Sequence, residues 1–461
     1  MSMDNEVRKG EEVEVRIDRL AFGGAGVGRL NGLVTFVPFT APGDVVRARI
    51  IKRKKSHAEA QVVQIVAPSP DRVTPPCPYF GVCGGCAWQH ISYARQLEAK
   101  QSLVQEAIEH IASLRGVAVS PILPSPVQYR HRNKMDLTFG LTPDGAPALG
   151  FHRPDNFRHV LDIETCRIQP EAMDRIVAVC REFIRQRDLS CYDPVRHTGL
   201  MRHLMMRHSV ATGSLLVVVT SATPPAEATP EYAELARRLR EAVPEARGFV
   251  WGANDKPADV MNVERVLYRE GEDRIEERLG STRFRISARS FFQTNTRATQ
   301  VLYDAIADGL ELDGSKTVLD AYCGTGSIGL YCARRAGAVW GLELITEAVW
   351  DARANAALNG LENCRFIAGD IRQTLRLAVE GLHGRPDCVI VDPPRGGMHK
   401  KALAGLLELE APALIYVSCN PTTLARDLTD ILGKGYRLAR IQPVDLFPQT
   451  YHVETVCRFE K

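Results

Sequence analysis

Short apolar segments alternate with polar residues in the first part of the chain. Between residues 11 and 66 apolar side chains recur at every second position, for example from Val13 to Ile17. Glycine-rich stretches at residues 23–26 and 42–44 interrupt the alternation and are typical of tight turns. This pattern predicts short strands that close into a small barrel. We therefore assign residues 1–67 to an N-terminal β-barrel domain.

The periodicity changes after a proline-rich linker at residues 68–76. Apolar positions recur at helical spacing over residues 93–114, which predicts an amphipathic helix that packs on the C-terminal domain. Residues 117–280 mix helical and strand patterns and contain no pattern typical of a cofactor fold. We assign residues 68–280 to an α+β central domain.

From Val318 onward, short apolar strands alternate with helical stretches. The predicted strands lie at residues 318–319, 340–342, 365–367, 388–391 and 414–417. Such alternation predicts a parallel, doubly wound sheet, in which ligands bind at the carboxyl ends of the strands. We assign residues 281–461 to a C-terminal α/β, Rossmann-like domain, so the chain is multidomain.

The charges of the chain nearly balance. Its 461 residues include 58 Lys and Arg against 55 Asp and Glu, so a nucleic-acid surface requires local clusters. Basic clusters occur at residues 47–55 and 196–208, and we expect both to bind a polyanion. No apolar run is long enough to cross a bilayer. We expect a cytoplasmic monomer without membrane contact.

Twelve cysteines in a chain of this kind indicate metal ligands, catalytic thiols or buried apolar residues rather than disulfides. Cys77, Cys83 and Cys86 form a C-x5-C-x2-C run, and Cys166 is an isolated fourth candidate. Four thiolates can hold either zinc or a [4Fe-4S] cluster. The spacing of the cysteines does not choose between these two groups.

Polar and reactive residues stand where the predicted C-terminal strands end. Residues 320–326 form a glycine-rich turn after the first strand, and Glu343 ends the second. Asp392-Pro393-Pro394-Arg395 follows the fourth strand, Val417-Ser418-Cys419-Asn420-Pro421 ends the fifth, and His452-Val453-Glu454 lies near the C-terminus. A single cysteine at such a place is commonly a buried apolar residue. Together with the other motifs at the strand ends, however, Cys419 is placed like a nucleophile.

Together these motifs resemble those of the S-adenosylmethionine-dependent RNA uracil-5-methyltransferases, and residues 11–66 resemble the TRAM domain, an OB-like barrel. The resemblance covers almost the whole chain. It implies S-adenosylmethionine as methyl donor and a [4Fe-4S] cluster on Cys77, Cys83, Cys86 and Cys166. It also implies cofactor contacts from Gln293, Tyr322, Ser327, Glu343, Asp370 and Asp392. In part of the family an Asn occupies the positions of Ser327 and Asp370.

The resemblance also implies the chemistry. Uracil C5 is a poor nucleophile until a thiolate adds to C6, and Cys419 matches the family's thiol. Glu454 matches the base that removes the C5 proton, a role that a raised pKa would suit. RNA is therefore the expected partner, with contacts from residues 129–134 and from His152-Arg153.

The sequence leaves several alternatives. The target is 23S ribosomal RNA or, as the alternative, the T-loop uridine of transfer RNA. An RNA amino-methyltransferase is less well supported, because such enzymes place an aromatic residue after Asp-Pro-Pro, where this chain has Arg395. A non-catalytic iron-sulfur RNA-binding protein would require both Cys419 and Glu454 to be incidental.

Overall fold

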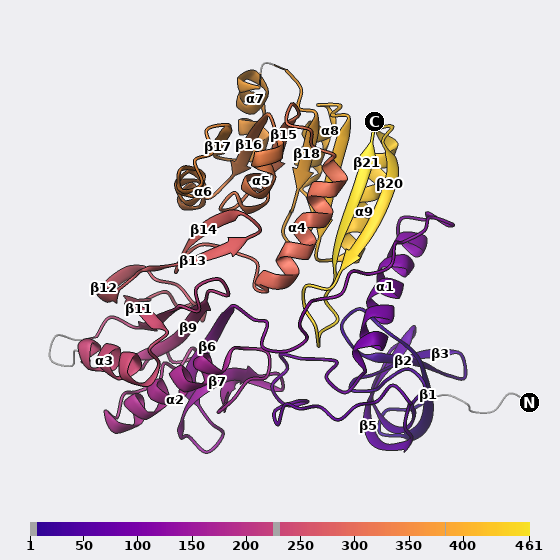
Figure 1. Ribbon diagram of the computed structural model, residues 1–461. Helices are drawn as coiled ribbons and strands as arrows, with labels where there is room; N and C mark the ends of the chain where they lie inside the picture. The colour runs from indigo at the N-terminus through magenta and orange to yellow at the C-terminus, as the bar shows by residue number, and fades with distance from the viewer. Residues whose placement is uncertain (1–6, 225–230, 383) are drawn as a thin grey trace, which may run out of the picture.

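The computed structural model describes residues 7–224, 231–382 and 384–461 (Figure 1). Residues 1–6 belong to the predicted barrel domain but lie outside the described residues. Within the described ranges, no helix combines the length and apolar character that crossing a membrane requires. In the view of Figure 1 the C-terminal sheet lies at the top, with the central sheet below it on the left and the barrel below it on the right.

The first five strands close into the small barrel that the alternating pattern predicts. They pair in the order β1-β2-β3-β5-β4. Their bounds are β1 Glu12–Leu20, β2 Gly26–Leu30, β3 Leu33–Val37, β4 Val45–Arg53 and β5 His57–Ala67. Val15, Val46 and Ile50 point into the barrel, whereas Arg47 and Arg49 alternate with them and are exposed. The basic cluster on β4 therefore faces solvent.

A long helix connects the barrel region to the C-terminal domain. Helix α1 (Tyr93–His110) buries Val104 and Ile108 against α9 and β20, so it packs on the C-terminal domain. The helix ends four residues before the predicted Leu114. Ser113 has a φ of 58°, a left-handed conformation that a helix does not continue through.

The central domain is built on a seven-stranded mixed sheet in the order β12-β11-β10-β9-β6-β7-β8. Its strands are β6 Lys134–Leu141, β7 Pro147–Arg153, β8 Asn156–Asp162, β9 Met201–His208, β10 Leu215–Ser221, β11 Ala246–Ala253 and β12 Arg265–Gly271. Helices α2 (Glu171–Gln186) and α3 (Tyr232–Ala242) cover one face, against Val217. Leu216 and Val218 on the other face pack towards the C-terminal domain.

Most of residues 196–208 do not form the basic surface that the sequence predicts, although Arg196 and His197, before β9, are exposed. Strand β9 lies between β10 and β6 in the sheet, and its residues Arg202 and Arg207 are buried. The guanidinium of Arg202 donates to the carbonyl of Asn254 at 2.7 Å, and that of Arg207 donates to the carbonyl of Ser290. These arginines satisfy buried carbonyls and are not available to RNA.

The C-terminal domain contains a second seven-stranded sheet, in the order β17-β16-β15-β18-β19-β21-β20. Its strands are β15 Thr317–Ala321, β16 Ala338–Glu343, β17 Cys364–Ala368, β18 Cys388–Val391, β19 Ala413–Ser418, β20 Arg437–Val444 and β21 Glu454–Glu460. The five predicted strands are parallel, as expected. At one edge β21 pairs antiparallel with both β19 and β20, so β21 runs against the other strands and β20 runs with them. The chain order reverses between β15 and β18, which is where open sheets of this kind bind ligands.

Helices cover both faces of this sheet (Figure 1). One face packs against α4 (Thr296–Leu310), α5 (Ser327–Cys332) and α6 (Thr346–Leu358). The other packs against α1 and against α7 (Ile371–Gly381), α8 (Lys400–Leu407) and α9 (Pro421–Gly433). A short 3-10 helix, Ala333–Arg335, follows α5. The predicted boundary between residues 280 and 281 falls at the turn of a hairpin formed by β13 (Arg274–Leu279) and β14 (Thr282–Ser287).

Candidate active site

Cys419 and Glu454 lie next to each other at the ends of two neighbouring strands. Strand β19 pairs antiparallel with β21, and Ser418 is the partner of Thr455. Cys419 follows Ser418 and Glu454 precedes Thr455, so the two residues take the next position on the facing strands. Cys419 is half-buried and Glu454 is only 4% exposed. The sheet register thus brings together two residues that lie far apart in the sequence.

The backbone after Cys419 turns at once into a helix. The side chain of Asn420 caps α9 by accepting from the N–H of Thr422 at 3.0 Å, and Pro421 takes the first helical position. The side-chain amide of Asn420 also donates to the carbonyl of Arg395 at 3.3 Å. The Ser-Cys-Asn-Pro sequence therefore ends the strand, starts the helix and ties the cysteine to the loop after β18.

The carboxyl of Glu454 has a pKa suited to a base near neutral pH. Burial raises the pKa of Glu454 to about 8, the negative charge of Asp392 adds to this shift, and the positive charge of Arg395 opposes it. Burial also raises the pKa of the Cys419 thiol to about 11, again with Glu454 and Asp392 adding and Arg395 opposing. Arg395 is thus the nearby positive charge that favours the thiolate.

Two further carboxyls stand at the ends of β15 and β18. Burial raises the pKa of both Asp320 and Asp392 to about 7. Asp320 accepts from the N–H of Gly329 at 2.9 Å through one oxygen, while its other oxygen is buried without a hydrogen-bond partner in the described residues. The charges of Asp392 and Glu343 add to the raised pKa of Asp320, so these carboxyls form one electrostatic group.

Three of the predicted cofactor residues line one pocket. Tyr322, Glu343 and Asp370 stand at the ends of β15, β16 and β17 and surround a cavity of about 230 Å³, with Leu344 and Ile371 as apolar lining. This combination of a carboxylate, an aromatic ring and apolar side chains fits a nucleoside. It lies at the carboxyl edge of the parallel strands, as the fold predicts.

The carboxylate of Glu343 is held in place by backbone donors. One oxygen accepts from the N–H of Gly324 at 3.0 Å and the other from the N–H of Ile345 at 2.9 Å. Gly324 and Gly326 have φ angles of 54° and 74°, in the left-handed region that favours glycine. The glycine turn thereby fixes the orientation of Glu343, and each carboxylate oxygen retains capacity to accept another donor.

Asp370 has partners of its own in addition to facing the pocket. Its side chain caps α7 by accepting from the N–H of Arg372 at 2.9 Å, and the Arg372 guanidinium pairs with both carboxylate oxygens. These contacts lower the pKa of Asp370 to about 2, with the Arg372 side chain as the largest cause. Asp370 is therefore ionised and held at the pocket wall.

The structure places Gln293 and Ser327 outside the lining of this pocket. Gln293 lies in the loop before α4 and is 9% exposed, and its carbonyl accepts from the side chain of Asn133 at 2.9 Å. Asn133 is itself buried, so it does not offer the RNA contact that the sequence suggests. The hydroxyl of Ser327 is hydrogen-bonded to that of Tyr303 at 2.6 Å. The Ser327 side chain and the Gln293 backbone thus have structural partners here.

The four predicted ligand cysteines line a common cavity. Cys77, Cys83, Cys86 and Cys166 surround a space of about 120 Å³ that aromatic side chains, among them Tyr79, help to close. Burial raises the pKa of Cys86 to about 12 and that of Cys166 to about 11, and the neighbouring thiols add to the shift of each. Within the described ranges, no group of three or more His, Cys, Asp or Glu is placed to hold a metal ion. The four sulfur donors lining one space nonetheless fit an iron-sulfur cluster chemically.

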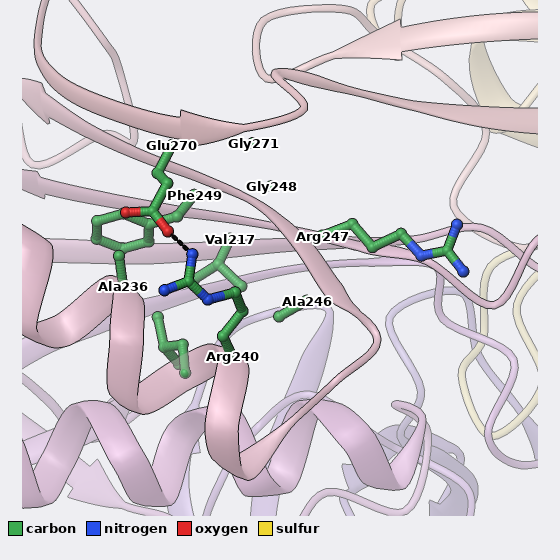
Figure 2. A pocket seen from close by; sticks show the side chains of 10 residues that line it. Val217, Ala236, Arg240, Ala246, Arg247, Gly248, Phe249, Glu270 and Gly271 are labelled. Atoms are coloured by element: carbon green, nitrogen blue, oxygen red, sulfur yellow. Dashed lines mark hydrogen bonds and ion pairs between the residues drawn. The ribbon is translucent and has the colours of Figure 1, made fainter.

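A smaller pocket lies in the central domain, away from these residues. This cavity has a volume of about 70 Å³. Figure 2 shows its lining, with Val217 and Phe249 on the sheet and Arg240 on α3. The guanidinium of Arg240 pairs with the carboxylate of Glu270 across the pocket (Figure 2). The charge of Arg240 is therefore already matched within the chain, and the pocket lacks the carboxylate-rich chemistry of the C-terminal pocket.

Sequence reasoning missed a buried ion pair next to the site. The Nζ of Lys100 on α1 donates to Oδ1 of Asp445 at 2.5 Å, and neither side chain has exposed surface. The available signal was a lysine at the helical spacing of the apolar stripe, four residues before Val104. Its partner could not be named from sequence, because 345 residues separate the pair.

Comparisons with known proteins show which family the chain belongs to. The tRNA (Uracil-5-)-methyltransferase family matches residues 270–461, and the TRAM domain matches residues 6–63. An uncharacterized RNA methyltransferase of Halalkalibacterium halodurans is 38% identical, over 98% of each chain. One from Chlorobaculum tepidum is 41% identical, over 91% of this chain and 90% of its own.

A solved structure extends the likeness to the whole fold. The Pyrococcus abyssi tRNA (uracil-54, C5)-methyltransferase, in complex with S-adenosyl-L-homocysteine, aligns with a TM-score of 0.78 and 28% identity, over 97% of this chain and 100% of its own. Fold and matches together define an RNA-modifying enzyme. The chain belongs to the RNA (uracil-5-)-methyltransferase family, with an N-terminal TRAM barrel. The resemblance to RNA uracil-5-methyltransferases with a TRAM domain is thereby confirmed.

Proposed function

We propose that this enzyme transfers a methyl group from S-adenosylmethionine to C5 of a uridine in RNA, through a covalent adduct with Cys419. The observation that carries the proposal is the register of β19 and β21, which places Cys419 beside Glu454 at the strand ends that also carry Asp392. The thiol, the base and the nucleoside pocket then share one edge of the sheet. This is the set of groups that the reaction needs.

The chain's own residues account for each step. The half-buried Cys419 thiol loses its proton to water, favoured by the positive charge of Arg395, and the thiolate adds to C6 of uracil. The C5 carbon gains the electron density of an enolate and attacks the methyl carbon of the sulfonium, which leaves as S-adenosylhomocysteine. The Glu454 carboxylate then takes the C5 proton, the C5–C6 double bond re-forms and the Cys419 thiolate departs.

The nucleoside pocket assigns roles to the cofactor residues. Glu343, already oriented by two backbone N–H groups, accepts from the ribose hydroxyls. Asp370 faces the adenine edge and Tyr322 the methionine side. Asp392 serves the methionine amino end or the reacting base. We retain Gln293 and Ser327 as cofactor contacts by family likeness, with Gln293 reaching the methyl donor from the loop before α4.

A large groove between the central and C-terminal domains offers a path for RNA. It has a volume of about 1200 Å³, and basic side chains such as Lys134 and Arg289 line it. Phe291 and Trp350 also line it and are 68% and 60% exposed. Exposed aromatic rings beside basic groups suit unstacked bases and phosphates. The exposed basic strand β4 of the barrel provides a second phosphate surface.

We propose that the RNA is 23S ribosomal RNA, because the combination of a TRAM barrel with four cluster cysteines is typical of family members that act there. A transfer RNA T-loop uridine is the second candidate. It is favoured by the family description and by the similar Pyrococcus abyssi enzyme, which is described as a tRNA (uracil-54, C5)-methyltransferase. We further propose that the protein acts as a monomer.

We propose that Cys77, Cys83, Cys86 and Cys166 hold a [4Fe-4S] cluster. The support is their shared cavity and the chemistry of four thiol donors, since each thiolate ligand also neutralises iron charge. When bound, the cluster would act as a structural staple for the central domain. Purified Cys86→Ser protein should have lost the cluster's absorbance and iron; a variant that keeps both would contradict the assignment, and a zinc content instead would favour zinc.

The decisive experiment supplies methyl-labelled S-adenosylmethionine with unmodified 23S ribosomal RNA and, separately, with unmodified transfer RNA. We expect label in 5-methyluridine from ribosomal RNA. Label in 5-methyluridine from transfer RNA alone would keep the reaction and change the target. Label on an exocyclic amine would overturn the carbon methylation itself.

A further inference from the structure

The loop of residues 445–453, which leads into β21, is anchored by residues of α1. The carboxylate of Asp445 accepts from Lys100 Nζ at 2.5 Å and from the Tyr93 hydroxyl at 2.8 Å. Lys100 Nζ also donates to the carbonyl of Phe447 at 2.9 Å. Lys100 and Asp445 have no exposed surface, so neither charge can exchange its partner for water. We refer to residues 445–453 as the base loop.

A second set of bonds holds the middle of the base loop. The carbonyl of Gln449 accepts from the backbone N–H groups of Ala87 and Trp88, each at 3.0 Å. Its side chain and backbone N–H exchange two further hydrogen bonds with the amide of Gln96, also at 3.0 Å each. Gln449 has a φ of 69°, an unfavourable conformation for a residue with a Cβ. Such strain persists only where surrounding contacts impose it.

The residues that contact Gln449 directly follow the cysteine run. Ala87 and Trp88 come next after Cys86, whose thiol lines the four-cysteine cavity. Trp88 is fully buried, and its Nε1 donates to the carbonyl of Gly24 in the barrel at 2.9 Å. One short segment therefore joins the cysteine cavity, the barrel and the base loop.

We infer that Lys100, Gln96 and Gln449 are positioning residues that hold the base loop, and through it the carboxylate of Glu454, against Cys419. The base loop leads directly into Glu454, the first residue of β21, so a shift of the loop displaces Glu454. The inference rests on the proposed roles of Cys419 and Glu454. It also gives the cysteine cavity a function, because the cavity shapes the segment after Cys86 and this segment holds the base loop.

The test compares two variants. Lys100→Met removes the charge and leaves Asp445 buried without its cation, whereas Gln449→Met removes only the side-chain bond that Gln449 Oε1 accepts from Gln96 and keeps the backbone bond. Arg181→Met is the matched control, because it breaks a largely buried pair with Asp162 at 2.8 Å in the central domain. Hydrogen exchange reports on residues 87–100 and 445–453. Single-turnover decay of the covalent protein-RNA adduct reports on the base.

We expect both positioning variants to exchange faster in both segments and to release the adduct more slowly. For Lys100→Met the release rate should fall about 10- to 100-fold, the size expected when a reacting group is slightly misplaced. Binding of S-adenosylmethionine should stay unchanged, and Arg181→Met should match the parent in all three measurements. Cys86→Ser should also raise exchange in residues 445–453.

Several results would overturn the inference. A folded Lys100→Met that releases the adduct at the parent rate would reduce the pair to a structural contact. Should Lys100→Met fail to fold, Gln449→Met decides alone by the same measurements. Glu454→Gln separates the two proposals: if it traps an adduct and the positioning variants do not, only the positioning role fails. If Glu454→Gln traps none, the proposed chemistry fails and the positioning role fails with it.

Discussion

The carboxylates of Asp392 and Glu454 lie close enough for the charge of Asp392 to raise the pKa of Glu454. The two residues come from different strands, with Asp392 after β18 and Glu454 at the start of β21. Burial of both groups means that water screens their repulsion only weakly. Burial, with the charge of Asp392 adding to it, therefore sets the pH at which the Glu454 carboxyl ionises.

Release of the covalent adduct should depend on pH through Glu454. Because the pKa of Glu454 is about 8, most of it is protonated below that pH and cannot accept the C5 proton. The release rate should rise with pH, reach half its maximum near pH 8 and then level off. Single-turnover decay of the adduct measures this step apart from addition by Cys419. A profile in Glu454→Gln as steep as in the parent would reassign the base.

Asp392→Asn should shift the rise of the release rate with pH to lower pH. The substitution removes the negative charge that raises the pKa of Glu454 and leaves burial and the Arg395 charge in place. The control is Asp387→Asn at the amino end of the same strand, where the carboxylate accepts from the N–H of Thr317 at 2.7 Å. The same adduct-decay profile checks both variants. If the release rate of Asp392→Asn rises at the same pH as that of the parent, burial alone sets the pKa of Glu454.

Asp320→Asn should stabilise the protein at alkaline pH. The folded-state pKa of Asp320 is raised to about 7, so the folded protein binds this proton more tightly than the unfolded chain. Its contribution to the free energy of unfolding is most favourable below the unfolded pKa and falls as pH rises to about 7. The gain above that pH should be on the order of 1–4 kcal/mol.

Thermal unfolding across pH checks this expectation for Asp320. An equal melting temperature for parent and Asp320→Asn on both sides of pH 7 would contradict it. The exposed Asp313→Asn serves as control, because contacts with Ser315 lower the pKa of that carboxyl instead of raising it.

Cys419→Ala should abolish methyl transfer and leave binding of S-adenosylmethionine unchanged, because the thiol acts on the uracil ring and lies outside the nucleoside pocket. Cys364→Ala is the matched control, a buried cysteine of β17 that should keep its activity. Transfer of labelled methyl to RNA, and calorimetric titration with the cofactor, give the two readouts. Methylation by Cys419→Ala near the parent rate would refute covalent catalysis.

Glu343→Gln should weaken binding of S-adenosylmethionine. A hydrogen bond to a charged group contributes roughly 1.5–3 kcal/mol, so the dissociation constant should rise about 10- to 150-fold. Glu347→Gln on the exposed side of α6 provides the control with the same change of charge. Calorimetric titration measures both. An unchanged dissociation constant for Glu343→Gln would move the ribose contact to another residue.

Local patterns carried much of the prediction. The alternation around Val15 and Ile17 requires one buried and one exposed strand face, and the barrel has that arrangement. In the same way, the apolar strands from Val318 onward lead to the motifs at the carboxyl edge of the sheet, which include Glu343 and Cys419. These signals are read within a few residues, so a single sequence contains them.

Other features depend on partners far along the chain. The basic residues Arg202 and Arg207 resemble a solvent-exposed cluster until β9 is placed inside its sheet. In the sequence Lys100 interrupts an apolar stripe, and only the structure shows that it pairs with Asp445. In both cases the sequence shows a charge but not the distant group that satisfies it.

The sequence by itself therefore determined the order of the domains, the parallel strands and the chemical groups at their ends, because hydrophobic period and turn chemistry act locally. Only the tertiary structure decided that antiparallel β21 lies beside β19 and that Glu454 thereby meets Cys419. It also decided how α1 and the segment after Cys86 hold the base loop by hydrogen bonds. Strand register and buried ion pairs join residues hundreds of positions apart, and the free energy of such contacts exists only once the chain has folded around them.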